Sequence, residues 1–164
     1  MEQSELIKQI RDICAVGGEA LSLSMLCDSV GTMGLPEPLV VHEGATIRDC
    51  VSLFRTSSVG GVCIVDQAGQ LIGIFTERDC VLRVTDVGVS MDTPVTSVMT
   101  KDPQREEPHA TIAFALTLMS HGGFRHLPIV HDGAPIGMLS VKNVVDYLVE
   151  KIMSGMVDNL DLAE

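Results

Sequence analysis

The 164-residue sequence has no apolar run that approaches the roughly 18 uncharged residues of a membrane-spanning helix. Its N-terminus, MEQSELIKQIRD, lacks the basic-then-apolar order of a secretory signal. The five cysteines include no Cys-x-x-Cys pair and are odd in number, which fits neither a disulfide framework nor a zinc site. We therefore expect a cytoplasmic protein without a membrane partner, in which the cysteines are reduced and act as small core residues.

Basic residues are also scarce. The chain has 11 Lys and Arg against 22 Asp and Glu, a formal net charge of −11. Binding a polyanion relies on many Lys and Arg contacts, so this balance argues against nucleic acid as a partner. A small anionic ligand stays possible where local basic groups or a helix N-terminus offset the acidic field.

Catalytic and metal-binding motifs are missing. The sequence contains no nucleophile elbow, no paired acids and no P-loop, so we expect no enzymatic activity. Four histidines fall in the second half of the chain, but their spacings match no metal-ligand motif. They are His109, His121, His126 and His131.

What the sequence does contain is an internal repeat. ATIRDCVSLF at 45–54 aligns with ATIAFALTLM at 110–119, an offset of 110 − 45 = 65. GIFTERD at 73–79 aligns with GMLSVKN at 137–143, an offset of 137 − 73 = 64. The offset changes by one residue where QAGQ in the first copy aligns with a shorter Asp-Gly turn in the second. A hairpin loop tolerates such a deletion most easily.

Both copies predict the same order of elements. Thr46 and Thr111 each precede apolar residues at the i, i+3, i+4, i+7 spacing of an N-capped helix, and a β-hairpin follows. A second helix is short in the first copy. In the second copy it is longer and carries an apolar stripe of Val141, Val144, Val145, Leu148, Val149, Ile152, Met153 and Met156. With short extended segments at 39–42 and 104–106, each copy reads β-α-β-β-α.

These patterns predict an α+β fold. The hydrophobic content of 46% is enough for the chain to bury a core. The predicted boundaries are an N-terminal helical segment at 1–30, copy one at 31–84, a linker at 85–103, copy two at 104–157 and an acidic tail at 158–164.

A tandem pair of β-α-β-β-α units, each ending in Gly-apolar-x-Thr/Ser-x-x-Asp/Asn, resembles a pair of CBS (cystathionine β-synthase) domains, the Bateman module. SVMT at 97–100 and RHLPIV at 125–130 add to a resemblance that covers roughly 38–153. It implies two repeats packed through their sheets with pseudo-twofold symmetry, two clefts between them, and frequent dimerisation. Ligand-binding members take AMP, ADP, ATP or S-adenosylmethionine. Asn143 departs from the commoner Asp.

The repeated motif has two compatible interpretations. Thr76 with Asp79 forms a Ser/Thr-x-x-acid capping box, and Ser140 with Asn143 would do the same. The carboxylate could also accept hydrogen bonds from both ribose hydroxyls, while the Thr76 hydroxyl and the helix N-terminus donate to a phosphate. Arg78 and its equivalent Lys142 could assist an anion, since 142 − 64 = 78.

The resemblance places Arg125 and His126 on the strand edge that faces the cleft, as phosphate candidates. Copy one has Gly60-Gly61 there and lacks the basic pair. Adenine would need apolar walls and backbone amides. The remaining ligand-binding candidates are the motif glycines Gly73 and Gly137, and the wall residues Ile74, Met138, Val62, Leu127 and Val41.

We expect a regulatory or sensor module that binds an adenine nucleotide, AMP to ATP, and signals to a target protein that the sequence does not name. No other cofactor is expected. The long apolar stripe predicts a homodimer through the helices of both copies. Two alternatives stay open: a ligand-free dimerisation or interaction scaffold, and an S-adenosylmethionine sensor. Basic groups and few aromatics near the motif favour phosphate over a sulfonium.

Overall fold

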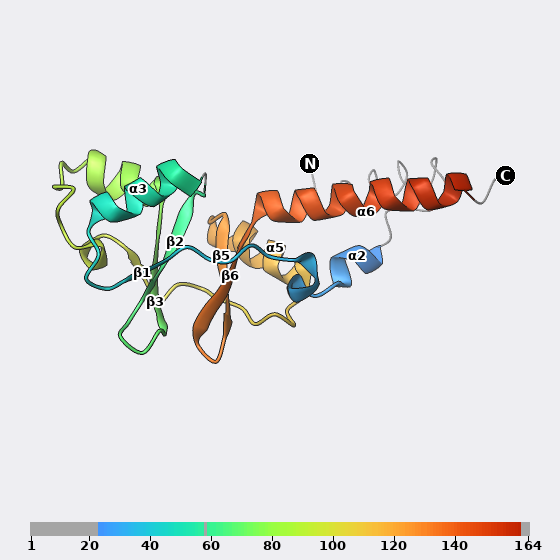
Figure 1. The fold of residues 1–164 in the computed structure, drawn as a ribbon, viewed down its shortest axis with the longest axis horizontal. Helices are drawn as coiled ribbons and strands as arrows, with labels where there is room; N and C mark the ends of the chain where they lie inside the picture. Colours follow the sequence, from blue (N-terminus) through green and yellow to red (C-terminus); the bar gives the residue numbers. More distant parts are fainter. Residues whose placement is uncertain (1–22, 58, 162–164) are drawn as a thin grey trace.

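The computed structural model describes residues 23–57 and 59–161. Figure 1 shows copy one on the left, copy two in the middle and α6 extending away beyond it. The helices are α2 (Leu23–Cys27), α3 (Ile47–Ser57), α4 (Glu77–Asp79), α5 (Ile112–Gly122) and α6 (Val141–Asp161), with a π-helix η2 (Cys80–Thr85) and 3-10 turns η1 (Val30–Met33) and η3 (Val95–Ser97). The strands are β1 (Val40–His42), β2 (Gly61–Val65), β3 (Leu71–Thr76), β4 (Thr100–Lys101), β5 (His126–His131) and β6 (Ala134–Ser140).

Copy one contains a four-stranded sheet in the order β1-β2-β3-β4. β1 runs parallel to β2, because helix α3 connects them, and the other two pairs are antiparallel. The predicted strand, helix, hairpin and short second helix are all present. The fourth strand comes from within the predicted linker at 85–103, where Thr100 and Lys101 pair with β3.

Copy two has a smaller sheet. β5 and β6 form the predicted antiparallel hairpin. The predicted extended segment at 104–106 contributes a single parallel bridge, between Glu106 and Ile129. Pro103 and Pro108, which have no N–H to donate, bound the stretch over which this pairing could extend.

The two hairpins differ by one residue at their turns. Val65 pairs with Leu71, 71 − 65 = 6 positions apart, whereas Val130 pairs with Pro135, 135 − 130 = 5 positions apart. Each hairpin also shifts register just before this pair. The predicted position of the deletion is therefore confirmed.

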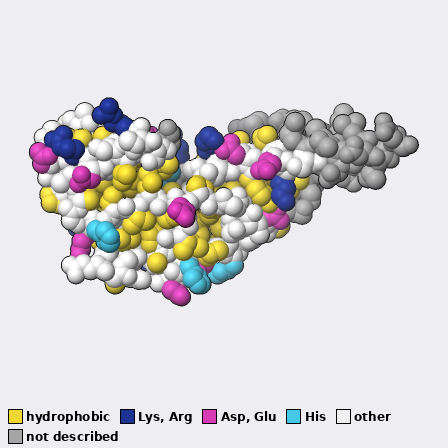
Figure 2. All heavy atoms as spheres, in the orientation of Figure 1, with side chains coloured by type: hydrophobic (Ala, Val, Ile, Leu, Met, Phe, Trp, Pro, Cys, Tyr) yellow, Lys and Arg dark blue, Asp and Glu magenta, His cyan; other side chains and the backbone are white. Residues whose placement is uncertain are grey.

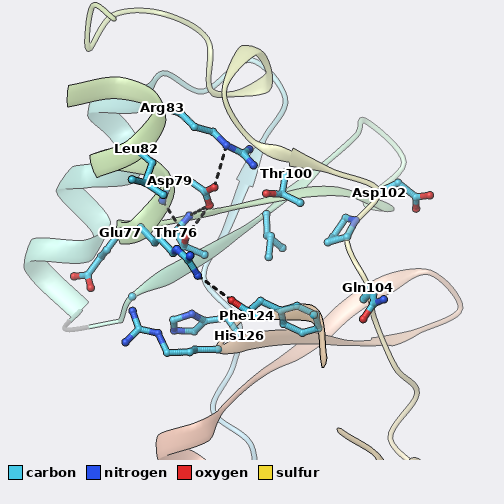
Figure 3. A pocket seen from close by; sticks show the side chains of 17 residues that line it. Thr76, Glu77, Asp79, Leu82, Arg83, Thr100, Asp102, Gln104, Phe124 and His126 are labelled. Atoms are coloured by element: carbon cyan, nitrogen blue, oxygen red, sulfur yellow. Dashed lines mark hydrogen bonds and ion pairs between the residues drawn. The ribbon is translucent and has the colours of Figure 1, made fainter. Parts of the chain in front are cut away.

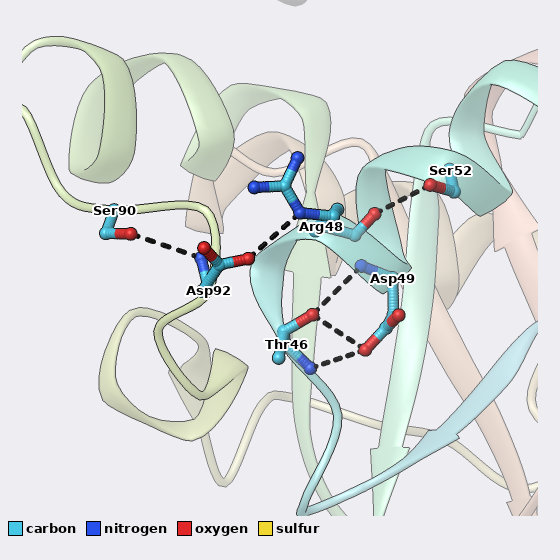
Figure 4. A network of polar contacts seen from close by, with 6 residues as sticks. All are labelled: Thr46, Arg48, Asp49, Ser52, Ser90 and Asp92. Carbon is cyan, nitrogen blue, oxygen red and sulfur yellow. Dashed lines mark hydrogen bonds and ion pairs between the residues drawn. The ribbon is translucent and has the colours of Figure 1, made fainter.

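Threonine hydroxyls cap the first helix of each copy. Thr46 donates its N–H and its hydroxyl to Asp49 Oδ2 at 2.8 and 2.7 Å, and the Asp49 N–H donates back to Thr46 Oγ1 at 3.3 Å (Figure 4). These hydrogen bonds hold the pKa of the Asp49 carboxyl below its usual value. In copy two, Thr111 Oγ1 accepts from the Phe114 N–H at 3.2 Å. Both predicted N-caps are confirmed.

The segments that lead into the two copies cross over. We call residues 28–38 the first lead-in and residues 93–103 the second lead-in. Val30 of the first lead-in is fully buried in the core of copy two. Val95 of the second lead-in is fully buried in the core of copy one. Each copy therefore completes its core with the segment that precedes the other copy.

The crossed contacts repeat with the same offset as the sequence. The Val30 N–H donates to the Ala110 carbonyl at 2.9 Å, and the Val95 N–H donates to the Ala45 carbonyl at 2.9 Å. Both pairs obey the repeat, since 95 − 30 = 65 and 110 − 45 = 65. The backbone thus has pseudo-twofold symmetry, as the predicted fold requires.

The two sheets meet through a small apolar cluster. Cys63, Leu71 and Ile74 come from copy one, and Val130 and Met138 come from copy two. On the face drawn in Figure 2, hydrophobic side chains gather where the copies join, and most charged side chains lie toward the edges. This cluster fixes the distance between the copies.

The predicted apolar stripe of α6 divides between two faces. Val144 is buried and Leu148 packs partly into the core of copy two. Val141, Val145 and Val149 are 38%, 53% and 53% exposed. The helix therefore covers copy two with one face and leaves a second apolar face uncovered among the described residues.

The cysteines follow the prediction in part. Cys50 and Cys63 are buried, and burial raises their thiol pKa values to about 11 and about 12. Cys80 is partly buried, whereas Cys27 is exposed, so the expectation of a core residue is wrong for Cys27. Cys27 is the last residue of the short helix α2, which packs against α5.

Some predictions concern residues or side chains that the structure does not describe. They include the N-terminal helical segment up to residue 22, the end of the acidic tail at 162–164, the side chains of Met153 and Met156, and Cys14. Within the predicted N-terminal segment, the described part contains α2 and the start of the first lead-in.

Candidate functional site

A cavity of about 580 Å³ opens between the two copies. Its walls are the end of β3 with α4 and η2 from copy one, the second lead-in, and the stretch from the end of α5 to the start of β5 in copy two (Figure 3). The sequence builds such a cleft because β3 ends in polar residues that start a helix, and the strand edge at 124–126 faces them.

Asp79 lies in this cavity as part of a capping box. The Thr76 N–H and hydroxyl donate to Asp79 Oδ2 at 3.0 and 2.6 Å, and the Asp79 N–H donates to Thr76 Oγ1 at 3.3 Å. The capping interpretation of this motif is therefore confirmed. The box holds the carboxylate in one orientation, with Oδ1 outside it.

Arg83 faces Asp79 from the next turn. Its Nε lies 3.4 Å from Asp79 Oδ1, and its Nη1 donates to the Val98 carbonyl in the second lead-in at 3.0 Å. Arg83 belongs to η2, and π-helical turns occur frequently at functional sites. It thus links the carboxylate to the segment that joins the copies.

Arg78 spans the cleft. Its Nη1 donates to the Gly123 carbonyl at 2.8 Å, from α4 in copy one to the end of α5 in copy two. Gly123 caps α5 with a φ of 66°, a left-handed conformation that glycine adopts without steric cost. The contact closes one side of the cavity with a cation.

His126 fills the space that two glycines leave in copy one. A Cβ at Gly60 would lie 3.2 Å from His126 Cε1, and one at Gly61 would lie 3.5 Å from His126 Cγ. Burial lowers the pKa of His126, the charge of Arg125 lowers it further, and Glu77 opposes both effects. Because copy one has glycines where copy two has Arg125 and His126, it leaves room for the His126 ring of copy two.

The structure brings six of the predicted site residues together around the cavity. They are Ile74, Thr76, Arg78, Asp79, Arg125 and His126. They come from both copies and mix one carboxylate, one hydroxyl, two guanidinium groups, one imidazole and an apolar side chain. This combination suits a ligand with a polar hydroxylated part and an anionic part.

Four other predicted residues lie in the cores or between the sheets. Val41 and Val62 belong to the core of copy one, and Leu127 belongs to that of copy two. Met138 lies in the cluster between the sheets. None of the four lines this cavity.

The predicted motif glycines make room for packing. A Cβ at Gly73 would lie 2.4 Å from Met99 Sδ, and one at Gly137 would lie 3.1 Å from Leu35 Cδ1. Each glycine therefore admits a side chain from a lead-in against the strand. Neither lines the cavity.

The second motif lies away from this cavity. Ser140 donates its N–H and hydroxyl to Asn143 Oδ1 at 2.9 and 2.6 Å, the same box as in copy one. Lys142 forms an ion pair with Asp146 within α6 and does not reach the other copy. The predicted candidates Ser140, Lys142 and Asn143 thus lie together where β6 ends and α6 begins, and none of them lines the cavity.

Sequence reasoning did not single out most of the cavity wall. The additional residues are Gly60, Glu77, Leu82, Arg83, Thr100, Asp102, Pro103, Gln104, Gly122, Gly123 and Phe124. One signal was available for Arg83, which follows Asp79 by four residues on a predicted helix. The residues of the second lead-in and of the α5 end carry no pattern that assigns them to a cleft.

The described residues contain neither a cluster of potential metal ligands nor a helix that could cross a membrane. No group of three or more His, Cys, Asp or Glu residues there could hold a metal ion. No helix within 23–57 and 59–161 combines the length and apolarity needed to cross a membrane.

Comparisons with known proteins agree with this architecture. The CBS domain model matches residues 30–86 and 95–150. An uncharacterized 17.7 kDa protein of Acidianus ambivalens is 28% identical over 126 residues, 76% of each chain. The CBS domain-containing protein CBSCBSPB2 of Arabidopsis thaliana is 32% identical over 114 residues, 69% of this chain but 21% of that protein.

A solved structure shares the fold. The CBS domain protein PAE2072 of Pyrobaculum aerophilum, complexed with AMP, superposes with a TM-score of 0.66 and 21% identity, over 71% of this chain and 89% of that one. At this identity the likeness concerns the fold alone. The two family matches cover most of both repeats and of both lead-ins, and the chain therefore belongs to the CBS-domain family as a tandem pair.

Proposed function

We propose that the chain is a regulatory module that binds an adenine ribonucleotide, AMP to ATP, in the cavity between the copies. The observation that carries the proposal is that one cavity holds Asp79 together with Arg78, Arg83 and Arg125. A carboxylate beside several guanidinium groups matches a ribose diol attached to phosphate. The proposed role is regulatory and assigns the chain no chemical step of its own.

The ribose would bind at Asp79. Thr76 fixes this carboxylate through the capping box, so its orientation is set before a ligand arrives. Preorganisation of this kind reduces the entropy lost on binding. Hydrogen bonds to a carboxylate are stronger than those between neutral groups. Three carboxylates line the cavity, those of Glu77, Asp79 and Asp102, and Asp79 is the one that the capping box orients.

The phosphate would bind among the arginines. Arg78 and Arg83 come from copy one and Arg125 from copy two, so an anion between them contacts both copies. Guanidinium groups recognise phosphate with paired hydrogen bonds. Local cations of this kind outweigh the net charge of −11, because salt screens distant charges over about 8 Å.

The adenine would bind against apolar side chains. Ile74, Leu82, Pro103 and Phe124 all line the cavity. The volume of about 580 Å³ falls within the range of roughly 300–1,000 Å³ that is usual for small-molecule sites. The AMP complex of PAE2072 supports the choice of ligand by analogy of fold.

Calorimetric titration with AMP, ADP, ATP and S-adenosylmethionine tests the proposal. We expect the nucleotides to bind and S-adenosylmethionine to bind more weakly, because a sulfonium gains nothing from the arginines. A thermal shift offers a check, since a ligand at 100 times its dissociation constant adds about 2.7 kcal/mol of stability. Absence of nucleotide binding, or tighter binding of S-adenosylmethionine than of AMP, would refute the proposal.

We also propose that the chain forms a homodimer. The exposed face of α6, with Val141, Val145 and Val149, supports this because contiguous exposed apolar surface usually marks an interface. Phe114 on α5 adds a further exposed apolar side chain, at 49% exposure. Sedimentation equilibrium at micromolar concentration should give twice the chain mass, and a mass of 17.6 kDa would contradict the dimer.

A further inference from the structure

Only one oxygen of the Asp79 carboxylate is open to further hydrogen bonds, and Arg83 lies beside it. An ionised carboxylate offers about four acceptor positions, two on each oxygen. The Thr76 N–H and hydroxyl fill both positions on Oδ2. Arg83 Nε lies 3.4 Å from Oδ1 as an ion pair without a hydrogen bond. Oδ1 therefore keeps its acceptor positions, but the guanidinium stands beside the oxygen that the two ribose hydroxyls would approach.

Of the contacts to Asp79, the ion pair with Arg83 is the one that a ligand can displace. Ion pairs between guanidinium and carboxylate are usually about 2.7–2.9 Å long, and this one is longer. The Arg83 side chain is 46% exposed, while that of Asp79 is 13% exposed. The capping bonds of Thr76, in contrast, also terminate β3 and start α4, so breaking them would disturb the fold.

We propose that Arg83 is a displaceable counter-ion of Asp79: a ribose diol replaces it at Oδ1, and the released guanidinium then binds the phosphate of the same ligand. This inference rests on the proposed nucleotide function. In Figure 3, Arg83 lies beside Asp79 at the cavity wall, on the side where Thr100 faces in. A short swing therefore keeps the guanidinium within the cavity.

Arg78 is less suited to this exchange. Its guanidinium bonds to the Gly123 carbonyl across the cleft and does not contact Asp79. A ribose at Asp79 would leave that contact unchanged. Arg83 alone among the cavity arginines is paired with the proposed ribose acceptor in the described structure.

Copy two does not repeat the arrangement. Tyr147 occupies the position equivalent to Arg83, since 147 − 64 = 83, and its hydroxyl donates to Asp28 Oδ2 at 2.6 Å. Asn143, which replaces Asp79, is neutral and needs no counter-ion. The exchange is therefore a property of the copy-one motif.

The test compares adenosine with AMP, because adenosine has the ribose without the phosphate. In Arg83→Met, adenosine should bind about two- to five-fold more tightly, since its competitor for Asp79 is gone. AMP should bind about ten- to hundred-fold more weakly than in the wild type, since the phosphate loses a charged partner. The two affinities move in opposite directions, which a loss of packing could not produce.

Two further variants complete the design. Arg55→Met removes the same charge from an exposed position on α3 outside the cavity, and both affinities should stay within about two-fold of wild type. Arg83→Gln keeps an N–H donor for the Val98 carbonyl, and it should reproduce the opposite changes even if Arg83→Met folds poorly.

The outcomes separate this inference from the proposed function. If Arg83→Gln weakens adenosine and AMP in parallel, or leaves both unchanged, the exchange is wrong while nucleotide binding stands. If the wild type binds neither adenosine nor AMP, the proposed function itself fails. Opposite changes in the Arg83 variants, with Arg55→Met unaffected, establish the exchange.

Discussion

Copy one and copy two share the crossed backbone hydrogen bonds of their lead-ins but use equivalent side chains differently. In copy one, Arg78 reaches across the cleft to Gly123, whereas its equivalent Lys142 pairs with Asp146 in its own helix. Arg83 contacts the second lead-in, whereas its equivalent Tyr147 contacts the first. The two copies thus have similar backbones, and the side chains of the copy-one motif are the ones suited to an anion.

The difference begins at the strand that faces each motif. Copy one offers Gly60 and Gly61 where copy two offers Arg125 and His126. The glycines accept the His126 ring, so the basic pair closes the cleft that also contains Asp79. An acidic motif in one copy and a basic strand in the other therefore serve the same cavity. We propose that the Asn143 motif plays a lesser role in nucleotide binding.

The largest expected effect comes from the two cores. Phe75 is fully buried and stacks on Phe54, with ring centroids 6.0 Å apart, and its equivalent in copy two is Leu139, also fully buried. Phe75→Ala should cost about 3–5 kcal/mol of unfolding free energy, and Leu139→Ala about 2–5 kcal/mol. Because the lead-ins cross, we expect each variant to unfold in a single transition in urea. Two separate transitions would mean that the copies fold independently.

The next effect compares the two motifs in ligand binding. Asp79→Ala should weaken AMP binding by about ten- to hundred-fold, because a charged acceptor is lost. Asn143→Ala removes the equivalent side chain from copy two and should change AMP affinity by less than about two-fold. Calorimetric titration of both variants measures this difference. Equal losses would show that both clefts bind the nucleotide.

A smaller effect compares the N-caps. Thr46→Ala and Thr111→Ala should each cost about 0.5–2 kcal/mol of unfolding free energy. Thr46→Ala should lower the unfolding free energy more than Thr111→Ala does. The Thr46 hydroxyl both accepts from the Asp49 N–H and donates to the Asp49 carboxylate, whereas the Thr111 hydroxyl only accepts in the described structure. Denaturation at pH 7 gives both values. A larger loss for Thr111 would contradict the ranking.

The smallest effect concerns pH and one histidine. Burial lowers the pKa of His126 in the folded state, so the unfolded chain takes up the proton first. Stability should therefore fall as pH drops below about 6.5 toward the folded-state pKa. His126→Asn should flatten the dependence of the unfolding midpoint between pH 7.5 and 5.5. Identical slopes for the variant and the wild type would remove His126 as the cause.

Local features of the fold were predictable from the sequence. The caps at Thr46, Thr76 and Thr111 and the hairpins depend on residues that are near in sequence, so short patterns report them. The offset of the repeat located the deletion at the turns. The same reasoning identified Asp79 and its neighbours because one short motif contains them.

Crossed and long-range contacts were not predictable in this way. Val30 and Val95 are apolar residues in short segments, and no local pattern says which copy they pack against. Arg78 bonds to Gly123, 123 − 78 = 45 positions away, through a carbonyl that every residue has. The predicted wall residues Val62 and Leu127 lie in the cores, because a strand that is apolar on both faces does not reveal which face meets the other copy.

The crossing of the lead-ins bears on how a growing chain can fold during its synthesis. Copy one is encoded first, yet its core lacks Val95 and its sheet lacks β4 until the chain has grown past Lys101. The first lead-in waits longer, because the copy that receives Val30 is completed only when Val144 on α6 is available. Translation therefore exposes unpaired apolar surface on the early half of the chain. Emergence of the chain as far as Val144, rather than of copy one alone, is what lets both copies close.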